Sequence, residues 1–202
     1  MKDASAGIWA AGAFAAAVAL AVGVIVRRGA DGDGIVMALR LTARWSYLWF
    51  WPAYAGGALA ALFSPLFRPV AQRARVFGLA FAAALMVHAG LVAWLYHIAA
   101  HPPAKGTLLF FGMALLFTCL LALLSVPRLA QLLTPKHLQM LRTLGTEYIA
   151  LAFLVDFAQN PFDGSFVKLL AYLPFQILAA AGLLLRIVVY GLHRAHPRRL
   201  TI

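Results

Sequence analysis

The sequence predicts an all-α integral membrane protein, built as one domain of six membrane-spanning helices. Of the 202 residues, 64% are hydrophobic and only 11% are charged, whereas a soluble domain would be about half apolar and a quarter charged. The apolar residues form long runs, and about 20 apolar residues are enough for a helix to cross the hydrocarbon core. The six predicted spans are residues 8–26, 45–62, 77–97, 108–124, 144–157 and 166–192.

The first run could be mistaken for a secretory signal peptide. Its leading segment MKDASAG is weakly charged, and Arg27 and Arg28 follow the run where a cleavage site would be expected. We therefore expect residues 8–26 to be a membrane helix that is retained.

The second span follows a Gly/Asp-rich breaker and an amphipathic stretch, residues 35–44, which we expect to be a short interfacial segment. The span itself begins with many aromatic residues. Trp and Tyr prefer the headgroup level, so these rings predict an interfacial aromatic belt; the alternative is an aromatic wall around a porphyrin. The residues are Trp45, Tyr47, Trp49, Phe50, Trp51 and Tyr54.

Proline-containing segments predict where spans end. SPLFRP, residues 64–69, should end the second span, and the third must end before Pro102 and Pro103, which cannot continue a helix. QNPFDG, residues 159–164, is a turn signal between the last two spans.

The formal net charge of +11 comes from basic residues between the apolar runs. That placement favours orientation by the positive-inside rule over nucleic-acid binding. The basic connectors follow spans two and four, and the tail is also basic, which predicts that both termini lie in the cytoplasm. We expect the membrane to be a bacterial inner membrane. The first connector opposes this, since it must lie outside; its arginines are Arg27, Arg28, Arg40 and Arg44.

His88 lies well inside the third span. An ionisable side chain at the centre of a membrane helix costs roughly 2.5–3.5 kcal/mol, so it usually has a partner or a function. We expect the ring to face the bundle interior, and histidine is a common haem ligand. His97, nine residues later, should face away from His88, and His101 lies beyond the span.

Several segments together resemble the ferric reductase-like transmembrane domain, and especially the haem-binding membrane subunit of bacterial methionine sulfoxide reductase systems. The segments are LRLTARW, SPLFRP, RARVFGLAFAAALMVH and LRTLGTEYIALAFLVDF. The resemblance covers roughly residues 38–160. It implies haem b held between helices, His88 as an iron ligand, and electron transfer across the membrane.

The fifth span departs from that family pattern. The family has histidines near its start and about thirteen residues on, whereas this chain has Arg142 and then Val155 and Asp156. Valine and arginine cannot ligate iron, so we predict no bis-histidine haem between spans three and five. His88 could hold a five-coordinate haem, or take Tyr148 or His137 as a sixth ligand.

The fifth span is also the most polar. Arg142 and Asp156 fall on nearly the same helix face, and Glu147 points elsewhere. They indicate a proton path or a partner-binding spot, or simply charges near the two interfaces. An apolar stripe should still pack this span beside span three: Ile149, Ala152, Phe153 and Val155. Without a porphyrin, its space would be filled by lipid tails, by a different prosthetic group or by bulky residues, of which the chain offers Met86, Trp94, Phe110, Phe111, Phe117 and Phe153.

Two functions of different classes follow. The first is an electron-transfer membrane subunit with haem b at His88, supplied by a separate redox protein or a quinol. The second is a haem-less relative that serves as a structural or partner subunit of a larger membrane complex. The sequence has no nucleotide-binding, zinc-protease or Cys-x-x-Cys motif, which makes an enzyme in its own right doubtful.

Overall fold

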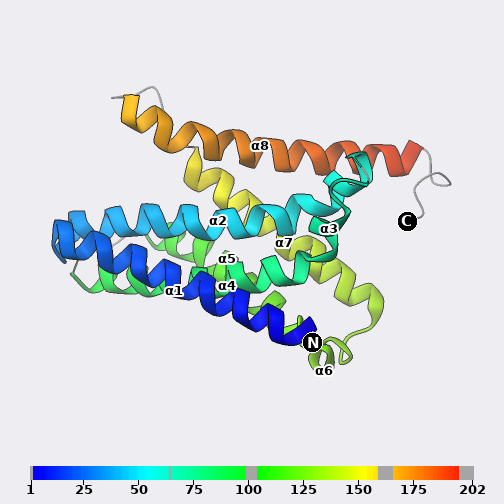
Figure 1. The fold of residues 1–202 in the computed structure, drawn as a ribbon, viewed down its shortest axis with the longest axis horizontal. Coiled ribbons are helices and arrows are strands. Elements are labelled where there is room, and N and C mark those ends of the chain that lie inside the picture. Colours follow the sequence, from blue (N-terminus) through cyan, green and yellow to red (C-terminus); the bar gives the residue numbers. More distant parts are fainter. Residues whose placement is uncertain (1, 64, 99–103, 159–165, 196–202) are drawn as a thin grey trace. The chain divides into compact units, whose positions relative to one another are not determined.

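The computed structural model describes residues 2–63, 65–98, 104–158 and 166–195. These residues form helices and contain no strand. The helices are α1 (Lys2–Arg28), α2 (Gly32–Phe63), α3 (Arg68–Gln72), α4 (Ala74–Ile98), α5 (Lys105–Leu123), α6 (Pro127–Ala130), α7 (Pro135–Phe157) and α8 (Phe166–Ala195) (Figure 1).

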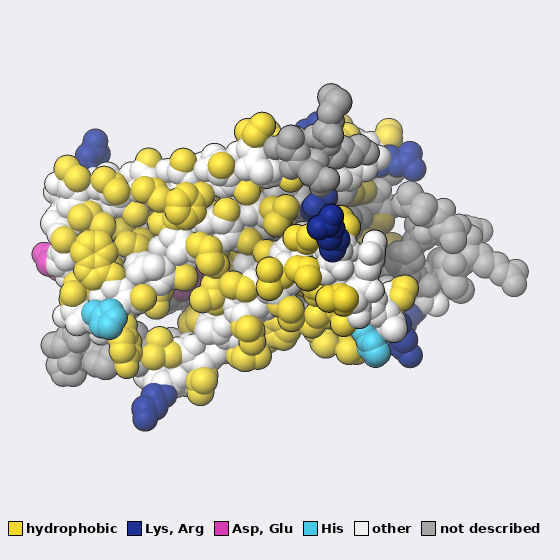
Figure 2. All heavy atoms as spheres, turned by 90° about the horizontal axis from the view of Figure 1, so that it is seen from below, with side chains coloured by type: hydrophobic (Ala, Val, Ile, Leu, Met, Phe, Trp, Pro, Cys, Tyr) yellow, Lys and Arg dark blue, Asp and Glu magenta, His cyan; other side chains and the backbone are white. Residues whose placement is uncertain are grey.

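Four helices are long and apolar enough to cross a membrane. These segments are Ser5–Arg28, Ala74–Ile98, Lys105–Leu123 and Ala171–Leu192, and they indicate a multi-pass membrane protein. Figure 2 shows hydrophobic side chains over most of the visible face. The other two long helices, α2 and α7, are not among these four; α2 contains Arg40 and Arg44, and α7 contains Arg142, Glu147 and Asp156.

Two helices, α2 and α7, begin far earlier than their predicted spans. α2 is continuous from Gly32, so the amphipathic stretch before span two is part of the same helix. Gly29, at φ +96°, ends α1, and the Asp31 carboxylate accepts a hydrogen bond of 2.9 Å from the Gly34 N–H. α7 begins at Pro135 rather than near residue 144, since Thr134 accepts a hydrogen bond from the His137 N–H and proline suits a first helical position.

The predicted breaks after spans two and three are confirmed. α2 ends at Phe63, directly before SPLFRP, and α4 ends at Ile98, before the two prolines. The QNPFDG turn lies outside the described residues.

The chain divides into two compact units. The first contains residues 1–50 and 75–149, and the second contains residues 51–74 and 150–202. α2 contributes its N-terminal half to the first unit and its C-terminal half to the second.

In the first unit, α1 and α4 lie alongside the N-terminal half of α2 (Figure 1). Four alanines that are at most 1% exposed form the contact between α1 and α4: Ala13, Ala17, Ala80 and Ala84. Small side chains let membrane helices approach closely. α5 and α7 also meet through a small residue, because a methyl group on Gly145 would lie 3.0 Å from the Leu121 side chain.

In the second unit, the C-terminal half of α2 pairs with α8. The Trp51 indole N–H donates to the Leu178 carbonyl at 2.8 Å, and the Arg186 guanidinium lies 4.7 Å from the centre of the Tyr54 ring. Gly182 lies under both aromatic side chains. α7 ends in this unit, where the Gln176 amide donates to the carbonyl of Phe157.

The aromatic-belt interpretation is wrong for three of the six residues at the start of span two. Tyr47, Phe50 and Tyr54 are only 2–3% exposed. They pack within the protein because their rings meet neighbouring helices, as Phe50 does with Phe81 at 5.1 Å.

Candidate functional site around His88

The His88 side chain lies between α4 and α2. Its Nδ1 atom is 3.1 Å from the Thr42 hydroxyl oxygen, and the residue is partly buried. The expectation that His88 faces a neighbouring helix is therefore confirmed. Thr42 itself is fully buried, as is Ser46 one turn later.

The hydrogen bonds around Thr42 assign a tautomer to the imidazole. The Thr42 hydroxyl donates to the Ala38 carbonyl at 2.9 Å and also lies 3.2 Å from the Leu39 carbonyl. Because its proton is directed at its own backbone, the Thr42 oxygen accepts from His88 Nδ1–H. This assignment, made from the network, leaves the lone pair of His88 on Nε2.

The surroundings of this pair are tightly packed. Ala21, Ala38 and Leu91 form a buried cluster with Val87, the residue before His88, packed against it. Helices in such contact have axes about 8–10 Å apart, so the Thr42 side of the ring has no room for a porphyrin. Only the Nε2 side could meet a ligand.

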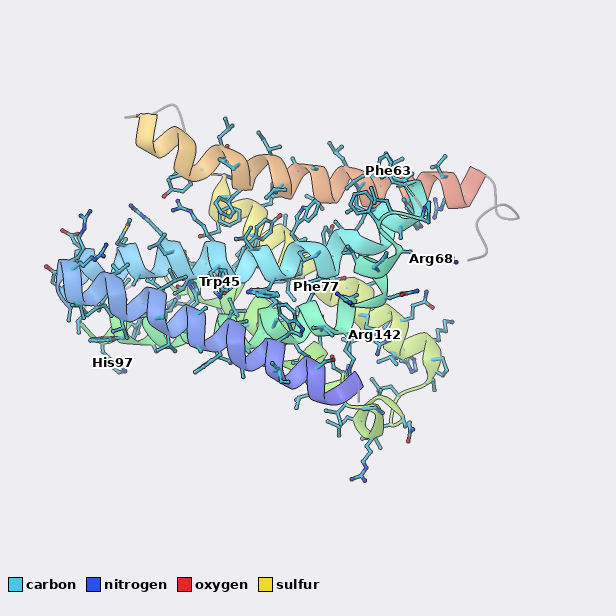
Figure 3. The ribbon with its side chains drawn as sticks, viewed as in Figure 1. Trp45, Phe63, Arg68, Phe77, His97 and Arg142 are labelled. Atoms are coloured by element: carbon cyan, nitrogen blue, oxygen red, sulfur yellow. The ribbon has the colours of Figure 1, made fainter. Side chains whose placement is uncertain are left out.

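The structure gives the other histidines and Tyr148 separate surroundings. His97 is exposed near the end of α4 (Figure 3), which confirms that it faces away from His88. His137 is exposed and pairs with the Thr134 hydroxyl at 3.0 Å. The Tyr148 hydroxyl donates to the Phe110 carbonyl on α5 at 3.1 Å, and His101 lies outside the described residues.

The polar residues of α7 differ in their exposure. Arg142 is exposed (Figure 3), while Glu147 and Asp156 are partly buried and have interaction partners. Among the described residues, no three His, Cys, Asp or Glu side chains are grouped to hold a metal ion.

The predicted apolar stripe of span five is confirmed in part. Ile149, Ala152 and Phe153 are buried, but Val155 is 49% exposed, so its assignment to the buried stripe is wrong. Within the first unit α7 contacts α5, through Gly145 and Tyr148.

The residues expected to fill a porphyrin space have different roles. Phe110 and Phe117 pack on Tyr148, with ring centres 5.5 and 5.4 Å away. Met86 and Trp94 are about two-fifths exposed, so the expectation that they fill an internal space is wrong.

Thr42 was missed by the sequence analysis, although a signal was present. It falls one turn after Ala38 and two turns after Ile35, on the apolar stripe of the stretch before span two. A hydroxyl on such a stripe is buried and needs a partner.

Comparison with protein-family models, with characterised proteins and with solved structures finds no match for this chain. The function must therefore be argued from the geometry alone.

Proposed function

We propose that this chain is a haem-less partner subunit of a bacterial inner-membrane complex, built on a six-crossing scaffold of the ferric reductase-like kind. The observation that carries the proposal is the use of His88: its Nδ1 atom pairs with Thr42 and joins α4 to α2. A polar side chain in a membrane helix is costly unless it has a partner. A hydrogen bond to a neighbouring helix offsets that cost and gives the side chain a structural role.

The remaining residues support the same assignment. Tyr148 and His137, the two alternative iron ligands, have their own hydrogen-bond partners, Phe110 and Thr134. A chain with no nucleotide-binding or catalytic motif, and with apolar helices exposed along their length, suits a role in assembly with other membrane proteins.

The proposed topology has six crossings with both termini in the cytoplasm. α2 and α7 have 32 and 23 residues, or about 48 and 35 Å of helix, which is long enough to cross despite their polar residues. A reporter enzyme fused after Arg199 should be active only in the cytoplasm. Activity only in the periplasm would contradict the topology.

The function is tested on the tagged full-length chain, extracted from its native membrane in a mild detergent. We expect native electrophoresis to show a complex with a second protein in fixed ratio, and an absorption spectrum without a Soret band after dithionite reduction. A chain that migrates alone would contradict the partner-subunit proposal.

One observation favours the second candidate, an electron-transfer subunit with haem b at His88. The Thr42 pairing leaves the Nε2 lone pair available, and a histidine that ligates metal through one nitrogen normally donates from the other. A Soret band that is present in the wild type and lost in His88→Leu would establish this candidate and overturn the first.

A further inference from the structure

The first unit contains an aromatic cluster formed by Trp9 on α1, Trp45 and Trp49 on α2, and Phe77 on α4. Trp49 is at its centre: its ring lies 5.7 Å from Trp9, 5.6 Å from Trp45 and 6.3 Å from Phe77, measured between ring centres. Figure 3 shows Trp45 and Phe77 on the helices that form this cluster.

The two α2 indoles of the cluster differ in one respect. Trp45 donates its N–H to the Ala13 carbonyl at 2.9 Å. The Trp49 N–H is buried and has no hydrogen-bond partner among the residues that the structure describes. Burial of a donor without an acceptor is costly, and more so in a membrane where water does not compete. An acceptor oxygen from outside the chain would remove that cost.

The cluster lies near one end of the membrane segments of α1 and α4. Trp9 is four residues after Ser5, where the apolar segment of α1 begins, and Phe77 is three residues after Ala74, the start of α4. At 1.5 Å per residue these rings lie about 6 and 4.5 Å inside the segment ends. Indole rings concentrate near the ends of membrane-spanning segments, at the headgroup level, and Trp49 packs directly against Trp9 and Phe77.

We infer that the cluster is a phospholipid-binding site, in which the Trp49 N–H donates to an oxygen of the lipid's glycerol-ester or phosphate group. Trp9, whose ring packs edge-on against Trp49, is 52% exposed, so movement of this one exposed side chain admits the lipid. The Phe77 ring and the exposed part of Trp9 contact the upper acyl chain. The site does not depend on the proposed function. In the proposed topology the N-terminus is cytoplasmic, so the site near the start of α1 would lie in the cytoplasmic leaflet.

The test compares two substitutions of the same kind, one turn apart on α2. Trp49→Phe removes the unpartnered N–H and keeps an aromatic ring, and Trp45→Phe removes the N–H that serves Ala13. The full-length chain in detergent is titrated with phosphatidylcholine or phosphatidylglycerol, and both its unfolding temperature and the lipid retained in native mass spectra are measured.

In the wild type we expect added phospholipid to raise the unfolding temperature and to remain bound. Trp49→Phe should lose most of that rise and the retained lipid, whereas Trp45→Phe should unfold at a lower temperature without lipid and keep the lipid-dependent rise. If both lipids raise the unfolding temperature equally, the acceptor is the glycerol ester or the phosphate, which the two lipids share. If only phosphatidylglycerol raises it, the site also contacts the glycerol headgroup.

A Trp49→Phe variant with the wild-type lipid response and retained lipid would overturn the inference. In that case the N–H is satisfied by water or by a neighbouring ring. If Trp49→Phe does not fold, Trp9→Ala, which opens the same site from its exposed side, should change the lipid-dependent rise; a wild-type rise in that variant would equally overturn it.

Discussion

The two halves of α2 pack against their neighbours by different means. In the first unit the N-terminal half packs against a contact of four alanines between α1 and α4, and it adds two side-chain hydrogen bonds. Thr42 pairs with His88 on α4, and the Trp45 indole N–H donates to the Ala13 carbonyl on α1. In the second unit the C-terminal half meets α8 through large aromatic rings, which lie against Gly182.

The difference shows which property of the side chains, small size or directed polar groups, fixes how the helices pack in each contact. Alanine side chains are small enough to let two helices approach closely, so a larger side chain at the same position would overlap the neighbouring helix. The contact between α2 and α8 depends on directed groups: the indole N–H of Trp51 bonds Leu178, and the guanidinium of Arg186 lies over Tyr54. We expect substitutions in the alanine contact and in the contact between α2 and α8 to destabilise the protein by different amounts.

The largest expected effect is at Ala84, which is fully buried in the alanine contact. Ala84→Leu adds three carbon atoms where α1 and α4 touch, and overpacking of this kind should lower the free energy of unfolding by roughly 3 kcal/mol. Thermal or denaturant unfolding in detergent measures it. Ala93→Leu, at an exposed position of the same helix, is the control and should be close to neutral; equal losses would mean that the alanine contact is unimportant.

A smaller effect is expected at Gly182. A methyl group there would lie 3.3 Å from the Trp51 indole nitrogen and from two Tyr54 ring carbons, so both rings must shift by a few tenths of an ångström. We expect Gly182→Ala to cost roughly 1–2 kcal/mol of unfolding free energy. Gly191→Ala, where nothing lies within 4 Å of the added methyl, should cost less; the reverse order would show that α2 and α8 do not pack closely.

Much of the fold could be predicted because membrane helices are determined by local composition. The runs of apolar residues gave the helices, and proline placed the ends of α2 and α4. The starts of α2 and α7 could not be predicted in the same way. Each depends on a single capping side chain, Asp31 or Thr134, and lies outside the apolar run.

The site was less predictable, since it depends on contacts between helices. The sequence indicated that His88 needs a partner, and the structure supplies Thr42, which is 46 residues away. The aromatic-belt interpretation failed for Tyr47 and Tyr54 because composition cannot show which face of a helix meets a neighbour. Only the three-dimensional packing distinguishes Trp45, whose N–H donates to Ala13, from Trp49, whose N–H meets no acceptor in the described part of the chain.

The smallest expected effect concerns the Thr42–His88 hydrogen bond, and a matched control makes it measurable. Thr42 and Thr118 are both buried, and each hydroxyl donates to the carbonyl four residues earlier, at 2.9 and 2.8 Å. Only Thr42 shows a side-chain partner on another helix among the described hydrogen bonds. Valine keeps the shape of threonine and removes the hydroxyl, so each substitution removes the same local bond.

Thr42→Val should therefore cost more than Thr118→Val, by about 0.6 kcal/mol, the average for interhelical hydrogen bonds in membrane proteins. The double substitution Thr42→Val with His88→Leu isolates the pair, because its cost should fall short of the sum of the single costs. Denaturant unfolding in detergent measures all four variants. Additive costs would show that the hydrogen bond does not hold α4 to α2, and would remove the observation on which the haem-less assignment of His88 rests.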